Sequence, residues 1–308
     1  GVPESIMKAI EKRFLETGHP KDLTYIHAAG SGDFTPHVSR GEDCLMHEGL
    51  MTKWIASHVG CSKKTQKYLS EGDKIAGWNL PLGTILQIFK EQARGVNFCL
   101  SKIGLDTFVD PRQDGGKITK AAFDLDEQWV EYIPDFRGEE WLLYKGWPLT
   151  VGFMRGTYAD EDGNISMEHL GVKAEALVVA QACKNSGGTV VAQVERVVAS
   201  GSLDPQKVEV PGILVDAVVV VSDMKNHMQT FGTQYNPGFS GEHRMGAAEF
   251  TPAPMSPKKI IARRAAMELK KNGIVNLGIG IPEYISSVAT EEGILDRFTL
   301  TVESGLTG

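Results

Sequence analysis

One short motif occurs twice in the 308-residue chain and constrains its fold more than any other feature. Gly-Val-Pro-Glu at residues 1–4 matches Gly-Ile-Pro-Glu at residues 280–283, and each copy opens a predicted helix that ends at a glycine. Each helix leads to a predicted strand, and residues 22–30 align with residues 297–305. Two matches in the same order indicate a duplicated α/β domain whose second copy has only begun at the end of this sequence.

Predicted strands and helices alternate along most of the chain, which indicates an α/β fold with largely parallel sheets. We expect a first α/β domain over residues 1–221, a linker or extended loop over 222–256, and the start of a second, related domain over 257–308. The predicted helices cover residues 3–17, 46–58, 84–93, 170–184, 257–271 and 282–292. The main predicted strands cover residues 22–28, 78–83, 189–197, 215–221, 274–277 and 298–302.

Composition excludes several classes of protein. The formal net charge is −7 and the sequence has no basic stripe, which argues against a nucleic-acid partner. The longest apolar run, residues 212–221, is too short to cross a membrane. Four widely spaced cysteines favour a reduced, cytoplasmic protein. The chain has no initiator Met and stops just after a strand, so we expect a piece of a longer protein that lacks roughly two hundred residues.

Glu303 directly follows the predicted strand that ends the chain, and its position is unusual for an acid. Strand 274–277, a glycine-containing loop with Gly278 and Gly280, helix and strand 298–302 form a βαβ unit. The loop and Glu303 therefore fall at the carboxyl edge of one sheet, where open α/β sheets place their ligands. The first copy of the repeat has Ala28 at the position of Glu303. The fold does not need an acid there, so the sequence predicts a functional role for Glu303.

The chemistry of such a glutamate is left open by its position alone. A carboxylate among backbone N–H groups stays ionised near neutral pH and can act as a general base, a metal ligand or a covalent nucleophile. No cluster of Asp, Glu and His at ligand spacing supports a metal site. A dinucleotide site is also disfavoured, because Glu283 stands where the third glycine of the fingerprint belongs.

Two groups of residues resemble family I CoA-transferases, and most closely the single-chain acetate/propionate CoA-transferases, which fuse two related α/β halves. In the second half the resemblance is carried by Asn-Leu-Gly-Ile-Gly-Ile-Pro at 276–282 and by Val-Glu-Ser-Gly at 302–305. In the first half it is carried by residues 108–117, 194–196 and 210–216.

The resemblance implies that Glu303 is a nucleophile that attacks an acyl-CoA thioester and later carries CoA as a glutamyl thioester. Transfer to a carboxylate acceptor such as acetate then follows ping-pong kinetics. It implies no cofactor and no metal, because CoA is part of the substrate. It also implies a homo-oligomer, with acyl-CoA and carboxylates as its small-molecule partners.

The resemblance also assigns substrate-binding residues, namely Asn79, Leu82 and Gly83 in the first half and Gly278 and Gly280 in the second. Relatives carry a glutamine where Leu82 stands, and the loss of one side-chain donor from an oxyanion hole costs about 3 kcal/mol. Two other functions stay open: an acyl-CoA hydrolase on the same scaffold, and a non-catalytic sensor of small molecules.

Overall fold

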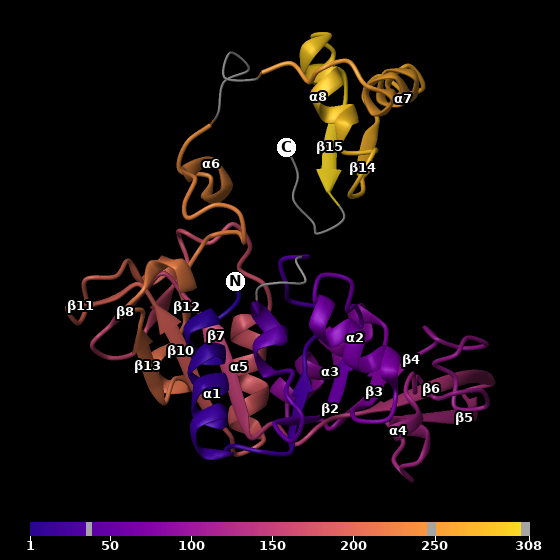
Figure 1. Ribbon diagram of the computed structural model, residues 1–308, viewed down its shortest axis with the longest axis vertical. Helices are drawn as coiled ribbons and strands as arrows, with labels where there is room; N and C mark the ends of the chain where they lie inside the picture. The colour runs from indigo at the N-terminus through magenta and orange to yellow at the C-terminus, as the bar shows by residue number, and fades with distance from the viewer. Residues whose placement is uncertain (35–38, 245–250, 303–308) are drawn as a thin grey trace. The chain divides into compact units, whose positions relative to one another are not determined.

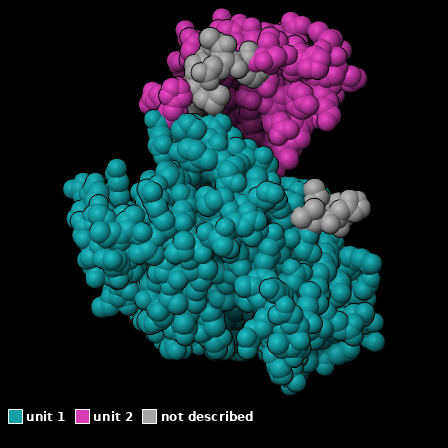
Figure 2. Space-filling view, turned by 60° about the vertical axis from the view of Figure 1, so that its left-hand side comes forward, with its two compact units in different colours: residues 1–242 teal, residues 243–308 magenta. Residues whose placement is uncertain are grey.

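The computed structural model describes residues 1–34, 39–244 and 251–302, and the chain divides into two compact units (Figure 1). Unit 1 comprises residues 1–242 and unit 2 residues 243–308, as coloured in Figure 2. Three of the sheets contain only parallel pairs, so the predicted α/β class with largely parallel sheets is confirmed. No helix in the described part of the chain has the length and apolar character needed to cross a membrane.

The first sheet of unit 1 is parallel, with strand order β1-β2-β3. Ile26 pairs with Ile55, and Ile55 pairs with Trp78, so the carboxyl ends of the three strands lie at one edge. The strands are β1 (Leu23–Ile26), β2 (Met51–Ala56) and β3 (Ala76–Asn79), and the helices are α1 (Glu4–Thr17), η1 (Gly41–Leu45), α2 (Lys63–Glu71) and α3 (Leu82–Ala93).

The predicted helix over residues 46–58 is wrong, because this segment contains β2. Met51, Trp54 and Ile55 are almost fully buried, since β2 is the central strand of its sheet. A central strand covered on both faces carries a nearly continuous apolar run, and such a run matches helical spacing by chance. The pairing with β1 and β3 decides the structure here.

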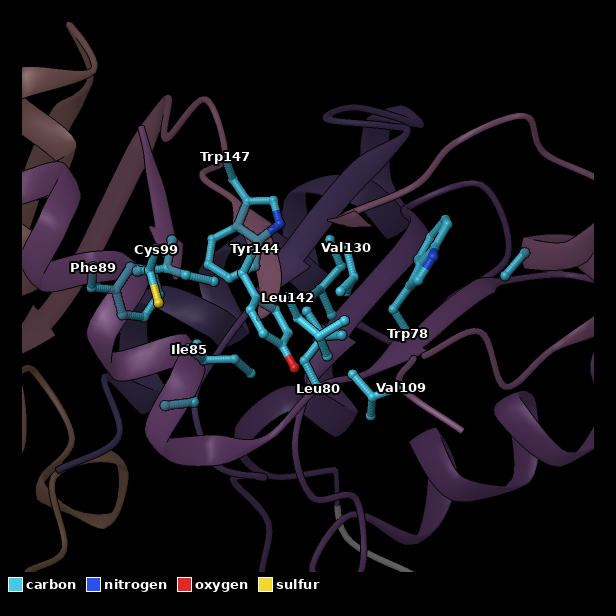
Figure 3. Packing of buried hydrophobic residues seen from close by; sticks show 14 of the residues in the cluster. Trp78, Leu80, Ile85, Phe89, Cys99, Val109, Val130, Leu142, Tyr144 and Trp147 are labelled. Atoms are coloured by element: carbon cyan, nitrogen blue, oxygen red, sulfur yellow. The ribbon is translucent and has the colours of Figure 1, made fainter. Parts of the chain in front are cut away.

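An antiparallel sheet of order β4-β6-β5 shares the core of the first sheet. Figure 3 shows Tyr144 and Leu142 from β6 among Trp78, Trp147 and other buried side chains. The Tyr144 hydroxyl donates to the Ile103 carbonyl at 2.6 Å, which satisfies its only polar group. The elements are β4 (Phe98–Ser101), α4 (Lys120–Phe123), β5 (Val130–Phe136) and β6 (Glu139–Lys145).

The second half of unit 1 contains a parallel sheet of order β13-β10-β7 with a core of its own. Helix α5 packs on β7 and β10, and it also contacts α3 of the first half. The strands are β7 (Val151–Arg155), β10 (Thr189–Val194) and β13 (Ala217–Val220), and α5 covers Ala176–Asn185.

A small mixed sheet contains β8 (Tyr158–Asp160), β9 (Ile165–Ser166), β11 (Arg196–Val198) and β12 (Val208–Val210), with η2 (Pro205–Lys207) and η3 (Gly212–Leu214) nearby in sequence. The remainder of the unit includes η4 (Met224–Asn226) and α6 (Pro237–Ser240).

Unit 2 contains the predicted βαβ unit. Strands β14 (Ile274–Leu277) and β15 (Thr299–Val302) are parallel, and α8 (Tyr284–Glu291) connects them. Helices α7 (Pro257–Ala266) and α8 pack together over an apolar core that includes Leu277. A short η6 (Leu295–Arg297) precedes β15.

Candidate active site

The glycine-containing loop of unit 2 begins at the carboxyl end of β14. Leu277 pairs with Val302, so the two parallel strands end level with each other. Gly280 has a φ of +104°, a backbone conformation that favours glycine. Among the residues that the structure describes, a Cβ atom placed on Gly278 or Gly280 would meet no other atom within 4 Å, so the described part of the chain leaves both positions uncrowded. Glu303 is the next residue after Val302, and it lies outside the described residues.

The N-terminus of α8 follows this loop and has no side-chain cap. Glu283 occupies the cap position but accepts no hydrogen bond there, whereas Ser256 caps α7 by accepting from the Lys259 amide at 3.3 Å. The first amides of α8, those of Tyr284, Ile285 and Ser286, donate to carbonyls of the preceding turn, so this helix end offers the positive end of the helix dipole. The loop of unit 2 therefore combines open glycine backbones with a helix end that favours negative charge.

The predicted substrate-binding residues of unit 1 lie where β3 runs into α3. The side-chain nitrogen of Asn79 donates to the backbone carbonyl of Ser57 at 2.9 Å, and this bond links the ends of β2 and β3. Leu82 is the first residue of α3 and is 43% exposed. Gly83 is exposed, and a Cβ on it would also meet no atom within 4 Å. The structure thus gathers Asn79, Leu82 and Gly83 at one carboxyl edge in unit 1, and Gly278 and Gly280 at another in unit 2.

The first copy of the repeat has a different environment, which sequence reasoning did not foresee. Ala28 is buried, and the Ser57 hydroxyl donates to its carbonyl oxygen. Glu4, the acid of the first Gly-x-Pro-Glu motif, is only 5% exposed. Its carboxylate accepts from the Gly41 amide at 3.2 Å, and burial raises its pKa. The nearby Glu42 is fully buried, which raises its pKa to about 7.

A second cluster of polar side chains, which the sequence did not predict, lies at the carboxyl edge of the β13-β10-β7 sheet. Arg155 ends β7 and Glu195 follows β10, and together with His169 and His227 they line a hollow of about 170 Å³. Burial lowers the pKa of Arg155 to about 10 and that of His227 to about 3. His227 falls in the predicted linker over residues 222–256. The composition of that segment gave no sign that His227 is buried in unit 1.

Comparisons with known proteins agree with this architecture. The family described as coenzyme A transferase matches residues 1–221. The chain belongs to the coenzyme A transferase family. Caffeate CoA-transferase from Acetobacterium woodii is 44% identical over 305 residues, which cover 99% of this chain and 57% of that protein. Acetate CoA-transferase YdiF from Escherichia coli K12 is 35% identical, with coverage of 99% and 55%.

A solved structure of the family shares the fold closely. The apoenzyme of acyl-CoA transferase YdiF from E. coli O157:H7 superposes with a TM-score of 0.86 at 34% identity, over 99% of this chain and 56% of that one. A thioester complex of that enzyme with CoA gives a TM-score of 0.85 at 35% identity. The chain spans about half the length of the curated relatives it matches.

Proposed function

We propose that the complete protein transfers CoA between a short-chain acyl-CoA and a carboxylate acceptor such as acetate, through a glutamyl-CoA thioester on Glu303. The observation that carries this proposal is the βαβ unit of unit 2, where the parallel strands end level at Leu277 and Val302 beside an open glycine loop. Membership of the coenzyme A transferase family supports the reaction class.

The reaction is a sequence of acyl substitutions. The Glu303 carboxylate attacks the thioester carbonyl of the donor, which gives an acyl-glutamyl anhydride and releases CoA thiolate. The thiolate attacks the glutamyl carbonyl, expels the donor carboxylate and forms the glutamyl-CoA thioester. The acceptor carboxylate then reverses both steps, so all atoms and charges balance. One thioester replaces another, so the exchange needs neither ATP nor a metal.

The loop of unit 2 has the properties that such intermediates require. Each tetrahedral intermediate carries an oxyanion, and preorganised N–H donors stabilise it. In this proposal the backbone N–H groups around Gly278 and Gly280 supply these donors, helped by the uncapped α8 N-terminus. Asn79, Leu82 and Gly83 contact the substrate from the first half of the protein.

The identity of the acids depends on the first turn of α3 in this proposal. An exposed Leu82 offers an apolar contact and no hydrogen-bond donor. The relatives named above include a caffeate and an acetate CoA-transferase, so both classes of acid are candidates. A panel of acetate, propionate and caffeate acceptors, run with the protein and with its Leu82→Gln variant, separates them. If a missing donor limits the rate, Leu82→Gln raises kcat with little change in KM.

Two further properties belong to the same proposal. The separated cysteines favour a reduced, cytoplasmic protein. We propose a homo-oligomer, which the molar mass of the complete protein in solution tests.

The decisive experiment looks for the covalent intermediate. The complete protein is incubated with acetyl-CoA without an acceptor, and the peptide that contains Glu303 is analysed by mass spectrometry. We expect a CoA adduct on Glu303, and inactivation by borohydride only after acetyl-CoA is added. Glu303→Ala abolishes adduct and transfer, whereas Asp296→Ala, which removes an exposed acid from η6, leaves both intact. Transfer by Glu303→Ala at a near wild-type rate refutes the proposal.

A further inference from the structure

A buried glutamine, Gln193, lies on β10 and connects two segments that are far apart in the sequence. Its side chain is fully buried, and all four of its hydrogen bonds go to groups outside β10. A buried amide is costly unless each polar atom is paired, so an arrangement of this kind constrains every group it contacts.

The amide oxygen of Gln193 caps helix α1. It accepts from the backbone amides of Ser5 at 2.8 Å and Ile6 at 3.3 Å. Pro3, at the N-cap position of α1, makes no side-chain cap hydrogen bond. The helix that opens the first Gly-x-Pro-Glu copy therefore takes its cap from a distant strand.

The amide nitrogen of Gln193 holds residues 222–242, the segment that ends unit 1. It donates to the Asn226 carbonyl at 2.9 Å and to His227 Nδ1 at 3.0 Å. Two other side chains hold the same segment: Arg155 donates to the Met228 carbonyl at 2.7 Å, and Lys8 of α1 donates to Asn226 Oδ1 at 2.7 Å. Gln193 thus joins the start of α1 to the last segment of unit 1.

The chemistry of these partners specifies a glutamine. The amides of Ser5 and Ile6 are donors and face the side-chain oxygen of Gln193. The Asn226 carbonyl, which cannot donate, and His227 Nδ1 are acceptors and face its nitrogen. Of the side chains of this size, only an amide accepts at one end and donates at the other. The same pairing makes Nδ1 of His227 an acceptor, which places the proton of the neutral ring on Nε2.

We propose that Gln193 is a positioning residue for CoA transfer, which fixes the N-terminal turn of α1 against residues 222–242. This inference rests on the proposed function. Residues 1–4 correspond by the internal repeat to residues 280–283, which begin with Gly280 of the loop that we propose to stabilise the oxyanion. Gly1 is the first-half counterpart of Gly280, and the start of α1 follows it within three residues, so the placement of α1 matters for the geometry of the reaction.

Two substitutions separate the two ends of the side chain. Gln193→Met removes all four hydrogen bonds at similar volume. Gln193→Glu keeps an acceptor for Ser5 and Ile6 but loses the donors to Asn226 and His227. The matched control is Gln92→Met on α3, since Gln92 is also buried and donates to the Trp147 carbonyl, away from the β13-β10-β7 sheet.

We expect Gln193→Met in the complete protein to lower kcat about tenfold to a hundredfold, with KM for acetyl-CoA changed less than about twofold. Hydrogen exchange becomes faster both at Ser5 and Ile6 and at residues 226–228. Gln193→Glu speeds exchange only at 226–228. Gln92→Met lowers thermal stability without either effect.

The Glu variant also has a pH signature that a merely structural change lacks. A proton on Nδ1 of His227 would restore a hydrogen bond to the new carboxylate. The charged and titratable side chains facing His227 are Glu195, Arg155 and His169. The new carboxylate raises the pKa of His227 above the value of about 3 that burial gives it, so the activity of Gln193→Glu relative to the unmodified protein falls as pH rises through that raised pKa, and that of Gln193→Met does not change.

Different results overturn different statements. If Gln193→Met lowers kcat no more than Gln92→Met, or if exchange at Ser5 and Ile6 is unchanged, Gln193 does not position α1. If the unmodified protein forms no adduct on Glu303, the proposed function fails, while the exchange data still decide whether Gln193 couples the two segments. If Gln193→Met does not fold, the exchange pattern and pH profile of Gln193→Glu decide.

Discussion

The two copies of the repeat have the same local structure and different surroundings. In the first, α1 leads to β1, and in the second, α8 leads to β15, with each strand in a parallel pair. Gly18 after α1 and Gly293 after α8 both have positive φ, so both helices end as predicted. Yet Glu4 of the first motif is buried against Gly41, whereas Glu283 of the second is exposed.

This difference shows how a duplicated motif divides its roles. In the first copy η1 covers the helix start and gives Glu4 a backbone partner. Ala28, two residues after β1, is buried, so that edge is part of the core. In the second copy none of the described residues crowds the glycine loop, and the position that corresponds to Ala28 is Glu303. In the proposed function the first copy is structural, and the second carries the acid proposed to react, Glu303.

The strongest test of this comparison removes the reactivity of Glu303 without removing its shape. Glu303→Gln in the complete protein lowers the initial transfer rate at least about 10⁴-fold, because an amide is not a nucleophile. Activity then recovers slowly, since a site that activates this carbonyl hydrolyses the amide to the acid. Rate assays over days, paired with the intact mass, follow the recovery. An initial rate within tenfold of the unmodified protein contradicts the assignment.

The reverse change places an acid in the first copy. Ala28→Glu destabilises the protein by roughly 3–5 kcal/mol, because it buries a charge without a partner, and it creates no second reactive site. Urea unfolding measures the loss, and Ala28→Gln, with the same volume and no charge, isolates the part due to charge. Equal losses for the two variants would show that volume alone excludes an acid there.

Glu42 lies in η1, which covers the first copy, and its burial predicts that the stability of the protein depends on pH. The pKa of Glu42 rises from 4.5 to about 7 on burial, so between these pH values the folded protein binds more protons than the unfolded chain. The free energy of unfolding therefore falls by roughly 3 kcal/mol as pH rises from 4.5 to 7. Glu42→Gln removes this fall and still accepts from the Trp54 ring N–H. Denaturant unfolding at several pH values measures this dependence. If the free energy of unfolding of Glu42→Gln falls with pH as steeply as that of the unmodified protein, Glu42 is not its cause.

The smallest effect compares the two motif glutamates directly. Glu4→Ala costs roughly 1–3 kcal/mol, because the buried Gly41 amide loses its acceptor. Glu283→Ala changes stability by less than about 0.5 kcal/mol, since that side chain is exposed. Chemical denaturation, followed by a probe in the unit that carries each residue, gives both values. Equal costs would mean that the two copies are more alike than their exposure indicates.

Local sequence determined the elements whose signals are local. Pro257 after Ser256 marked the start of α7, and the glycines marked the ends of α1 and α8. The strand over residues 274–277 has the predicted bounds, and its parallel partner follows from the handedness of βαβ units. The functional role of Glu303, the main candidate residue, was predicted by comparing two segments of the sequence with each other. That role stays a prediction.

Tertiary structure decided what depends on distant partners. Residues 51–56 form a strand because β1 and β3 offer hydrogen bonds on both sides, although their apolar spacing also fits a helix. Glu4 and Gln193 look like ordinary polar residues in the sequence, and only contacts with residues 37 and 188 positions away show them as buried. Helix caps and turns depend on neighbours within a few residues, so the sequence displays them. Burial and pairing depend on which distant segments meet, which a single sequence does not record.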